Sequence, residues 1–589
     1  MPAHDFDNFV LWLVTPLAAI FLLSGLDDIA VDLAWFYAWA AERLTVSRRD
    51  PRHIPDVPPR PIAILVPLWK EHAVIARMLE HNLAAIRYPD FHIFAGIYAN
   101  DGLTEEAVAS ISERFNNVHL AVCPHDGPTS KADCLNWIYQ HVGLYEEQNG
   151  IAFEVFITHD AEDLIHPEEL CWINAYATQF GFIQLPVLAL ATPFWSFTHG
   201  VYCDEFAEYH TRDMVVRSSF GCFVPGSGVG TGYSRDALDA LARACENRVF
   251  EPASLTEDYE SGLRLYRLGC GQVFVPLTRL KPAGRDFVAT REFFPTKWTT
   301  ALAQRTRWVL GIALQGWERF GWAGTRSEMY WLWRDRKGLL GNPLGVVANA
   351  VFLYGLTTAM WTRMTPLATE LTAVTLAFQA IRIAIRMGCV ARVYGFVFAL
   401  GVPLRLPYAN LLNAAATIQA VARYANARIR RIPLRWIKTE HSYPTRAALL
   451  SHKRPLGEIL QFLGYLDAPA LQAALAACPP GKRLGAFLVA SGELNEVNLY
   501  EALSLQQGLP IARIDPSEVR LRVARALPER IVREWRVLPF KIADGSLLLA
   551  SPDLPTAAMT AAVRPFTALE IRFHLLAPSD YKQLVDALL

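Results

Sequence analysis

The sequence predicts an α/β domain with a mostly parallel sheet, attached to a membrane by several helices and followed by a second soluble domain. Three observations support this prediction. Apolar runs alternate with helical patterns between residues 60 and 160, long apolar stretches lie near the amino terminus and between residues 340 and 440, and the composition turns soluble after Pro444. The 589 residues are too many for one core, and 52% hydrophobic beside 19% charged residues indicates a membrane portion.

The first apolar stretch, Phe9 to Leu23, predicts a membrane anchor within residues 1–45. Acidic rather than basic residues precede it, which disfavours a cleaved signal peptide. Arg48, Arg49 and Arg52 follow it, so the positive-inside rule predicts an external amino terminus and a cytoplasmic next domain. Because ionised carboxylates are costly in hydrocarbon, we expect Asp27, Asp28 and Asp32 at or below the inner interface.

Short apolar runs bounded by helical patterns come next and predict parallel strands. The strands are expected at Ile62–Val66, Phe91–Tyr98, Val118–Val122 and Phe153–Thr158, and helices at His72–Ile86 and Lys131–His141. No GxGxxG follows the first strand, which disfavours a dinucleotide enzyme. The glycine run from Gly226 to Gly232 has the wrong spacing for that motif and predicts a flexible turn near a ligand.

Acidic residues recur where these strands end, which is where an open α/β sheet binds ligands. Asn100-Asp101 follows the second strand, and the segment from His159 to Asp163 follows the fourth. Carboxylates so spaced can hold a divalent cation together with water and diphosphate oxygens. The alternative is a solvated acidic turn, with His159 a hydrogen-bonded structural histidine.

A later stretch carries an isolated acid in Thr256-Glu257-Asp258 and then the segment Gln304-Arg305-Thr306-Arg307-Trp308. If that segment is helical, Gln304, Arg307 and Trp308 share one face. An amide, a cation and an aromatic ring suit a sugar diphosphate, because they can bind hydroxyls, phosphate and a sugar ring. A surface helix with a structural tryptophan is the alternative.

The order of these motifs resembles that of family 2 glycosyltransferases with the GT-A fold, over roughly residues 60 to 320. Among them it resembles the membrane polysaccharide synthases that include cellulose synthase. The motifs are Pro67 to Glu71, Asn100-Asp101, Lys131 with Leu135-Asn136, Asp160 to Asp163, Gly226-Ser227, Thr256 to Asp258, and Gln304 to Trp308.

The resemblance implies how a UDP-sugar donor would bind. Glu71 and Asp101 would contact the uridine, and Lys131 would lie near the diphosphate. Asp160, with Glu162 or Asp163, would hold Mg2+ or Mn2+. The family's DxD reads Asp160-Ala161-Glu162 here, so which carboxylate completes the metal site stays open.

The resemblance also implies an inverting mechanism in which Asp258 is the catalytic base. Gly226-Ser227 would face the acceptor, Glu257 would lie beside the substrate, and Gln304, Arg307 and Trp308 would close the site. Val224-Pro225 stands where cellulose synthases carry aromatic and cysteine residues, which indicates a different acceptor.

Two further apolar spans, about Leu344 to Trp361 and Leu367 to Met387, predict an out-and-back hairpin within residues 340–440. From Val393 to Val421 polar residues and prolines interrupt the apolar pattern, and we expect interfacial helices there rather than another hairpin. The basic run from Arg428 to Lys438 predicts an inner-leaflet surface that contacts membrane lipids.

Residues 450–589 begin with an internal repeat at an offset of 28. Leu456, Gly457, Leu460, Gly464, Leu466, Leu471 and Leu475 recur as Leu484, Gly485, Leu488, Gly492, Leu494, Leu499 and Leu503. The pattern predicts two helix-turn-helix units. A pseudo-symmetric ligand would explain the duplication, and a helical hairpin that only packs against itself is the alternative. Strands are expected at Val537–Ile542 and Ser546–Ala550.

The repeat resembles the MshEN module, which binds cyclic di-GMP in secretion and pilus ATPases. The implied ligands are Arg454, Leu456, Gly457 and Gly464 in the first copy, and Arg483, Leu484, Gly485, Gly492 and Gln506 in the second. The first copy departs from the pattern at Pro455 and Cys478, so binding is expected to be asymmetric or weakened. No GxxxxGK[ST] occurs, so the ATPase that accompanies this module elsewhere is absent from this sequence.

Together these parts resemble the family of bacteriophage N4 adsorption protein B. The resemblance implies an inner-membrane, multi-pass hexosyltransferase with cytoplasmic soluble domains, which builds an exopolysaccharide under cyclic di-GMP control. A glycan or lipid-linked acceptor and an outer-membrane export partner are implied with it. Alternatives are transfer of a single sugar to a lipid carrier, and an envelope scaffold or phage adsorption component with a decayed transferase domain.

Two features of the composition exclude other classes. The net charge of -1 gives no electrostatic reason to expect nucleic acid as a partner. The nine cysteines are scattered singly, which disfavours a disulfide framework or a zinc ribbon and favours cytoplasmic soluble parts.

Overall fold

The computed structural model describes residues 3–45, 57–278, 286–434 and 455–589, apart from 480, 513 and 544. The predicted ligand Arg454, the arginines after the anchor and the end of the basic run at Lys438 lie outside the described residues. The chain divides into two compact units, Met1–Met78 with Ile86–Tyr443 and Leu79–Ala85 with Pro444–Leu589. Each unit is described by itself.

The first unit is built on a seven-stranded sheet of order β3-β2-β1-β4-β7-β5-β8. Its first four strands in the chain, β1 (Ile62–Pro67), β2 (Phe91–Tyr98), β3 (Val118–Cys123) and β4 (Val155–Thr158), pair in parallel, which confirms the prediction. β7 (Thr231–Ser234) runs antiparallel between β4 and β5 (Phe182–Gln184), and β8 (Gln272–Phe274) closes the edge.

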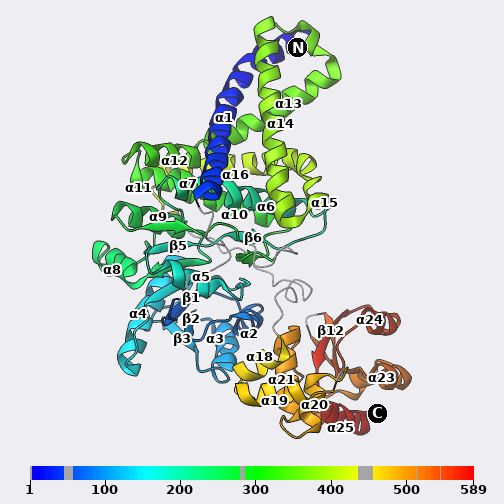
Figure 1. Ribbon diagram of the computed structural model, residues 1–589. Helices are drawn as coiled ribbons and strands as arrows, with labels where there is room; N and C mark the ends of the chain where they lie inside the picture. The colour runs from blue at the N-terminus through cyan, green and yellow to red at the C-terminus, as the bar shows by residue number, and fades with distance from the viewer. Residues whose placement is uncertain are drawn as a thin grey trace. The chain divides into compact units, whose positions relative to one another are not determined.

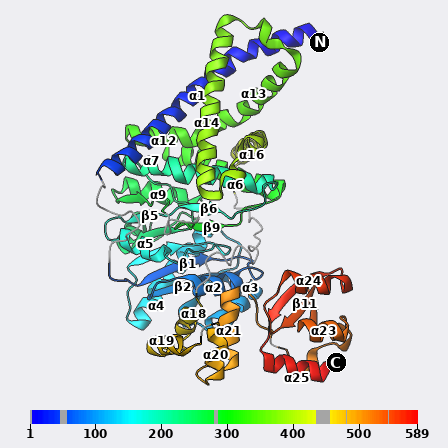
Figure 2. The ribbon, with the colours of Figure 1, turned by 45° about the vertical axis from the view of Figure 1, so that its right-hand side comes forward.

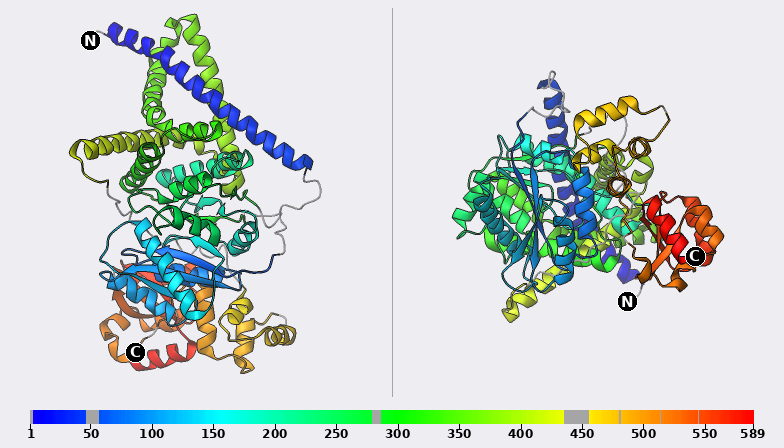
Figure 3. Two further views of the ribbon diagram at one scale, coloured as in Figure 1. Left: turned by 90° about the vertical axis from the view of Figure 1, so that its left-hand side faces the viewer. Right: turned by 90° about the horizontal axis from the view of Figure 1, so that it is seen from below.

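Helices cover both faces of this sheet, as the view from below shows (Figure 3). α2 (Ile75–Ala85), α3 (Gly102–Ser112) and α4 (Lys131–Asn149) connect the parallel strands. The strand order reverses at β1, which has β2 on one side and β4 on the other. Loops after β1 and β4 therefore open beside one another, at the position where such sheets bind ligands.

A second group of helices lies above the edge of the sheet where these loops open (Figure 1). They are α6 (Phe197–Glu208), α9 (Glu257–Arg267) and α10 (Trp298–Trp308), followed by α11 (Gly316–Phe320) and α12 (Arg326–Arg336). Two π-helical turns continue them, η1 (Tyr209–Asp213) after α6 and η2 (Val309–Gln315) after α10. A separate two-stranded sheet pairs β6 (Val187–Ala189) with β9 (Thr290–Glu292).

Among the described residues, three helices are long and apolar enough to cross a membrane: Phe6–Ala41 within α1 (Ala3–Thr45), α13 (Gly338–Thr358) and α14 (Pro366–Tyr394). α13 and α14 follow one another where the hairpin is predicted, and their crossing of a membrane stays a prediction. The apolar helix at the amino terminus extends beyond Phe9 to Leu23 on both sides. α1 crosses α14 obliquely (Figure 2), and the Thr375 hydroxyl of α14 donates to the Ala18 carbonyl of α1 at 3.0 Å.

The carboxylates of α1 are paired with cations from other parts of the first unit. Asp27 accepts from Lys337 at 2.7 Å and from the Tyr330 hydroxyl at 2.6 Å, and it also pairs with Arg334. Asp32 pairs with Arg212 of η1 at 2.6 Å. The helix therefore continues through the acidic stretch without leaving these charges unpaired.

The region expected to be interfacial forms α15 (Phe396–Ala399) and α16 (Val402–Arg430), and neither meets the criteria for a membrane span. α16 exposes Leu404, Leu411 and Ile418, spaced by seven, on one side. Its buried side braces α10, since Asn413 accepts from Arg305 at 2.6 Å. One apolar exposed stripe and one packed side fit a helix that lies at a membrane surface.

The carboxyl-terminal unit begins with two helical hairpins, α18 (Leu456–Phe462) with α19 (Ala468–Ala477) and α20 (Leu484–Ala490) with α21 (Glu496–Gln507). A three-stranded sheet follows, of order β10-β11-β12. β10 (Leu538–Ala543) and β11 (Ser546–Ser551) confirm the two expected strands, and β12 is Glu570–Leu575. α23 (Glu529–Trp535), α24 (Ala557–Val563) and α25 (Pro578–Leu588) pack with this sheet around one core.

Candidate functional site

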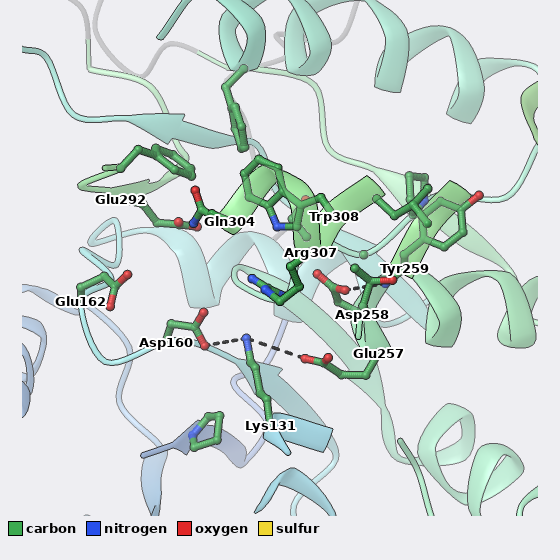
Figure 4. Close-up of a pocket in the computed structure, with 18 of the residues that line it drawn as sticks. Lys131, Asp160, Glu162, Glu257, Asp258, Tyr259, Glu292, Gln304, Arg307 and Trp308 are labelled. Carbon is green, nitrogen blue, oxygen red and sulfur yellow. Dashed lines mark hydrogen bonds and ion pairs between the residues drawn. The ribbon is translucent and has the colours of Figure 1, made fainter. Parts of the chain in front are cut away.

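One cavity of about 520 Å³ collects most of the residues that the motifs predict. Its lining includes Glu71, Lys131, Asp160, Glu162, Gly226, Ser227, Glu257, Asp258, Gln304, Arg307 and Trp308. Figure 4 shows Lys131, Asp160 and Glu257 on one side of the cavity and Gln304 and Trp308 of α10 on the other, with Glu292 beside Gln304. Asp101 and Asp163 do not line it.

Lys131 forms the floor of the cavity. It is the first residue of α4, and its ammonium lies 2.6 Å from Asp160 and 4.0 Å from Glu257 (Figure 4). Burial opposes the charge of this lysine, but the carboxylates of Asp160, Glu257 and Asp258 raise its pKa above the usual range. The floor therefore keeps a permanent cation where a diphosphate would need one.

Asp258 stands at the start of α9, in reach of the same lysine. Its Oδ1 accepts from the Tyr259 amide at 2.8 Å. Burial raises the pKa of Asp258, and burial followed by the charge of Asp258 raises the pKa of Glu257 to about 7. A raised pKa strengthens a carboxylate as a proton acceptor, which is the property that a general base needs.

The glycine run after Pro225 lies directly against this acid. A Cβ on Gly226 would stand 2.6 Å from the Asp258 carbonyl oxygen. Gly228 has a φ of +78°, and a Cβ there would stand 3.0 Å from Asp258 Oδ2 and 3.1 Å from Lys131 Nζ. Ser227 is fixed through its amide, which donates to Gln184 at 2.9 Å. The glycines therefore allow the loop to approach the reacting groups closely.

α10 confirms the helical face expected from the sequence, because Gln304, Arg307 and Trp308 all line the cavity. Arg307 donates to the Leu255 carbonyl at 3.0 Å, two residues before Glu257. Trp308 packs edge-on against Tyr202, with ring centroids 6.0 Å apart. Gln304 Oε1 and Arg307 Nε are buried and make no hydrogen bond within the described part of the chain, which leaves them available to a ligand.

The acids after β4 divide between the cavity and the core. Asp160 and Glu162 line the cavity, whereas Asp163 Oδ2 accepts from the Asp160 amide at 2.9 Å and lies 2.9 Å from His159. His159 also lies 3.1 Å from Glu169. Burial opposes its charge, but Glu169 and Asp163 raise its pKa to about 9. His159 is thus a buried structural cation that holds this loop.

The carboxylates on this side of the cavity suit a divalent cation that takes its remaining ligands from a substrate. Among the described residues, no group of three or more His, Cys, Asp or Glu is arranged to hold a metal alone. Glu292, at the end of β9, lines the cavity with Asp160 and Glu162. Burial, and then the charges of Asp163, Asp160 and Glu162, raises the pKa of Glu292 well above its usual value. Oxygen ligands crowded in this way favour Mg2+ or Mn2+.

The two residues expected near a uridine lie on neighbouring loops. Glu71 lines the cavity, and its amide donates to Thr104 at 3.0 Å. Asp101 accepts from the Lys70 amide, and Lys70 has a φ of +54°. Asp101 therefore holds the loop that carries Glu71, and its contact with a nucleotide stays a prediction.

Sequence reasoning missed one group of cavity residues. Glu205, Glu208 and Asp213 come from α6 and η1, Asp335 from α12, and Arg382 and Arg386 from the membrane helix α14. No motif marks these acids. The two arginines did carry a signal, because charged residues within a membrane span commonly mark functional sites.

In the carboxyl-terminal unit the repeat glycines are equivalent in geometry. A Cβ on Gly457 would meet Leu471 at 2.8 Å, and one on Gly485 would meet Leu499 at 2.5 Å. Gly464 and Gly492 have φ values of +69° and +77°. The fold itself therefore favours glycine at all four positions, and contact of these glycines with a ligand stays a prediction.

The other predicted ligands of this unit differ in exposure. Arg483 is exposed at the start of α20, whereas Leu456, Leu484 and Gln506 are half-buried. An exposed guanidinium beside a helix start can contact a nucleotide without rearrangement of the core. Arg483 is thus the residue of this set whose position most directly suits a ligand.

Comparison with known proteins identifies both soluble parts. Residues 58–311 match the model of glycosyltransferase-like family 2, and residues 507–589 match that of the MshEN domain. The chain is 33% identical over 606 aligned residues to bacteriophage adsorption protein B of Escherichia coli K12. It is equally similar to bacteriophage N4 adsorption protein B of E. coli O157:H7, and each match covers 96% of this chain and 81% of the relative.

Solved structures resemble separate parts of the chain. The structure of MshE with cdg is 30% identical and covers 23% of this chain and 97% of its own, with a TM-score of 0.20. The mannosyltransferase PcManGT from Pyrobaculum calidifontis, in complex with GDP-Man and Mn2+, is 16% identical. That match covers 66% of this chain and 98% of the other, with a TM-score of 0.40.

Proposed function

The chain belongs to the family of bacteriophage N4 adsorption protein B, and from this membership and the geometry of the cavity we propose that it is an inverting, metal-dependent hexosyltransferase. It uses a UDP-sugar to build a bacterial exopolysaccharide. The observation that carries the proposal is the convergence of Lys131, Asp160, Asp258 and the buried, unpaired polar atoms of α10 on one cavity. The soluble domains lie on the cytoplasmic side of the inner membrane.

Each residue has a chemical task in this proposal. Glu71 and Asp101 orient the uridine, while Lys131 and Arg307 meet the diphosphate. Asp258 takes the proton from an acceptor hydroxyl, whose oxygen attacks the anomeric carbon as UDP departs, so the anomeric configuration inverts. Asp160 and Glu162 would hold Mg2+ or Mn2+, which supplies positive charge to the diphosphate.

Substitution of Asp258 tests the proposal directly. General-base removal typically lowers rates by about two to four decades. Asp258→Asn in the purified full-length protein should therefore abolish transfer from the productive UDP-sugar, while UDP binding measured by calorimetry persists. Transfer at the wild-type rate would refute the base assignment. The size of the labelled product separates a glycan from a single sugar on a lipid, and absence of any turnover would favour a scaffold.

Regulation by cyclic di-GMP is the second part of the proposal, and the MshEN match supports it. A ligand can activate only if it binds the active state more tightly than the inactive one. Cyclic di-GMP bound near Arg483 should therefore raise the transfer rate of the full-length protein, and an unchanged rate at saturating ligand would contradict this.

A further inference from the structure

The carboxyl-terminal unit contains a strongly basic segment, residues 520–536. It holds six arginines and two glutamates, although the whole chain has a net charge of -1. Two of the arginines are paired, Arg533 with Glu529 and Arg536 with Asp553. The other four are exposed and make no ion pair with any described residue: Arg520, Arg522, Arg525 and Arg530. The segment therefore carries positive charge that the unit does not neutralise.

A short helix, α22 (Leu521–Ala524), fixes the direction of two of these arginines. The Arg525 amide donates to the Leu521 carbonyl at 3.0 Å, which continues the helical turn by one residue. Ala524 is fully buried in the core of the unit. Leu521, Arg522 and Arg525 therefore share the side of the turn that faces away from the core.

We name this exposed surface the basic face and define it by Arg520, Leu521, Arg522 and Arg525. Leu521 is 50% exposed, so one apolar side chain projects among three cations. α22 packs against β10, which means that folded structure presents the face. An apolar side chain between cations suits a bilayer with anionic head groups, because the cations meet lipid phosphate while the apolar group enters the interface.

A bilayer is also the anionic surface that the chain keeps within reach of this unit. Among the described residues, three helices of the first unit are long and apolar enough to cross a membrane. Residues 435–454 join the first unit to α18, and a chain of that length spans at most about 70 Å. Tethering gives such a surface a high effective concentration, whereas an acidic protein or a nucleic acid would have to arrive by diffusion. The observations therefore favour lipid.

We propose, on the basis of the proposed inner-membrane location, that the basic face docks the carboxyl-terminal unit on anionic head groups of the cytoplasmic leaflet. The guanidinium groups contact lipid phosphates, and Leu521 enters the interfacial region. This surface is separate in sequence from the predicted cyclic di-GMP ligands, the last of which is Gln506.

Hydrogen exchange in the full-length protein tests the proposal. The protein is reconstituted in nanodiscs of phosphatidylcholine alone or mixed with phosphatidylglycerol, and mass spectrometry follows the peptide that covers α22. Phosphatidylglycerol should slow exchange of this peptide at least about fivefold, the effect of a single arginine at an anionic surface. Peptides of β12, at the opposite edge of the sheet from β10, should exchange equally in both.

Two results of this experiment would overturn the proposal. Equal exchange of the α22 peptide in both kinds of nanodisc would show that anionic lipid does not cover the face, even if a protein does. A chain that does not associate with nanodiscs at all would refute the membrane location, and docking with it.

Salt provides a test that needs no variant. At about 1 M salt the Debye length is only about 3 Å, so the difference between the two lipid compositions should disappear. A difference that persists at this salt would show that charge does not drive the protection, and would overturn the proposal.

Charge reversal identifies the residues. Arg522→Glu with Arg525→Glu should abolish the dependence on phosphatidylglycerol. The matched control is Arg564→Glu with Arg572→Glu, which makes the same change of charge at exposed positions of the same unit and should keep the dependence. Loss of the dependence in both variants would show that total charge, rather than the basic face, is responsible and would overturn the assignment.

Discussion

At the scale of single residues, Gly228 shows how closely the chain passes its own reacting groups. Gly228→Ala should lower transfer at least tenfold, because the new methyl group would press on Asp258 and Lys131. The change also costs about 1 kcal/mol at a left-handed position. Gly221→Ala is a matched control, with a φ of +64° and nothing within 4 Å of its Cβ. Equal losses of activity in both variants would contradict the argument.

The raised pKa values of Glu257 and Asp258 predict an unusual pH profile. A carboxyl with a raised pKa takes up its proton at higher pH, so the base form disappears earlier on acidification. The initial rate should therefore fall on acidification at a pH above the ordinary aspartate value of about 4, because burial raises the pKa of Asp258. A pH-rate profile measured with saturating donor checks this.

Lys131 lowers the pKa of both acids, so its removal supplies a companion test. Lys131→Gln should shift the acidic limb of the profile to higher pH, in addition to weakening donor binding. Lys541→Gln, at an exposed position of β10, should leave the profile unchanged. A limb that stays in place in the Lys131 variant would show that other groups set the profile.

The sequence predicted part of this site and missed part of it, for a physical reason. Gln304, Arg307 and Trp308 could be predicted as one face, because helical periodicity is local. Glu292 and Asp335 could not, because each reaches the cavity only through tertiary packing. Asp163 looked equivalent to Glu162 in sequence, yet its contact with His159 turns it into the core.

At the scale of elements, α10 and η2 hold the segment that precedes the base. The Gln315 side chain accepts from the Leu255 amide at 3.0 Å and donates to the Ala253 carbonyl at 2.7 Å. Gly311 lies against Thr256, where a Cβ would stand 2.4 Å from the hydroxyl oxygen. The helix thus fixes the segment on both sides of Leu255 and, through it, the start of α9.

These contacts predict that Gln315 is a positioning residue for Asp258. Gln315→Met should lower kcat about tenfold while the KM for the UDP-sugar changes little, because the donor contacts lie elsewhere. Gln315→Glu keeps the acceptor for Leu255 and should lose less. Gln148→Met, at an exposed position of α4, serves as control. A rise in KM without a change in kcat would contradict the positioning role.

Strands could be predicted from the sequence where the alternation of apolar runs and helical patterns extends over many residues. β1 to β4 are separated by clear helical patterns, whereas β5 and β8 have three residues each and show no periodicity. α1 spans Ala3–Thr45 of the predicted anchor region, residues 1–45. The sequence could not show that Asp27 and Asp32 are paired, because their partners in α12 and η1 lie 307 and 180 residues away.

At the scale of the whole molecule, the chain combines a glycosyltransferase family 2-like domain with an MshEN domain. Arg483→Ala should abolish cyclic di-GMP binding by calorimetry and the activation that it causes, because the exposed guanidinium is lost. Basal transfer should remain. Arg530→Ala, exposed in the same unit, should bind as the wild type does. Unaltered binding by the Arg483 variant would place the nucleotide elsewhere.

The paired carboxylates of α1 also constrain how the protein is made. Asp27 and Arg334 are separated by 307 positions, so the ribosome releases the anchor long before its partner exists. Until that partner is present, the unpaired carboxylates of α1 are best solvated by water. We therefore expect the helix to reach its final position in the membrane only afterwards. On the same grounds we expect stable insertion of the first segment to depend on the folding of the domain that follows it.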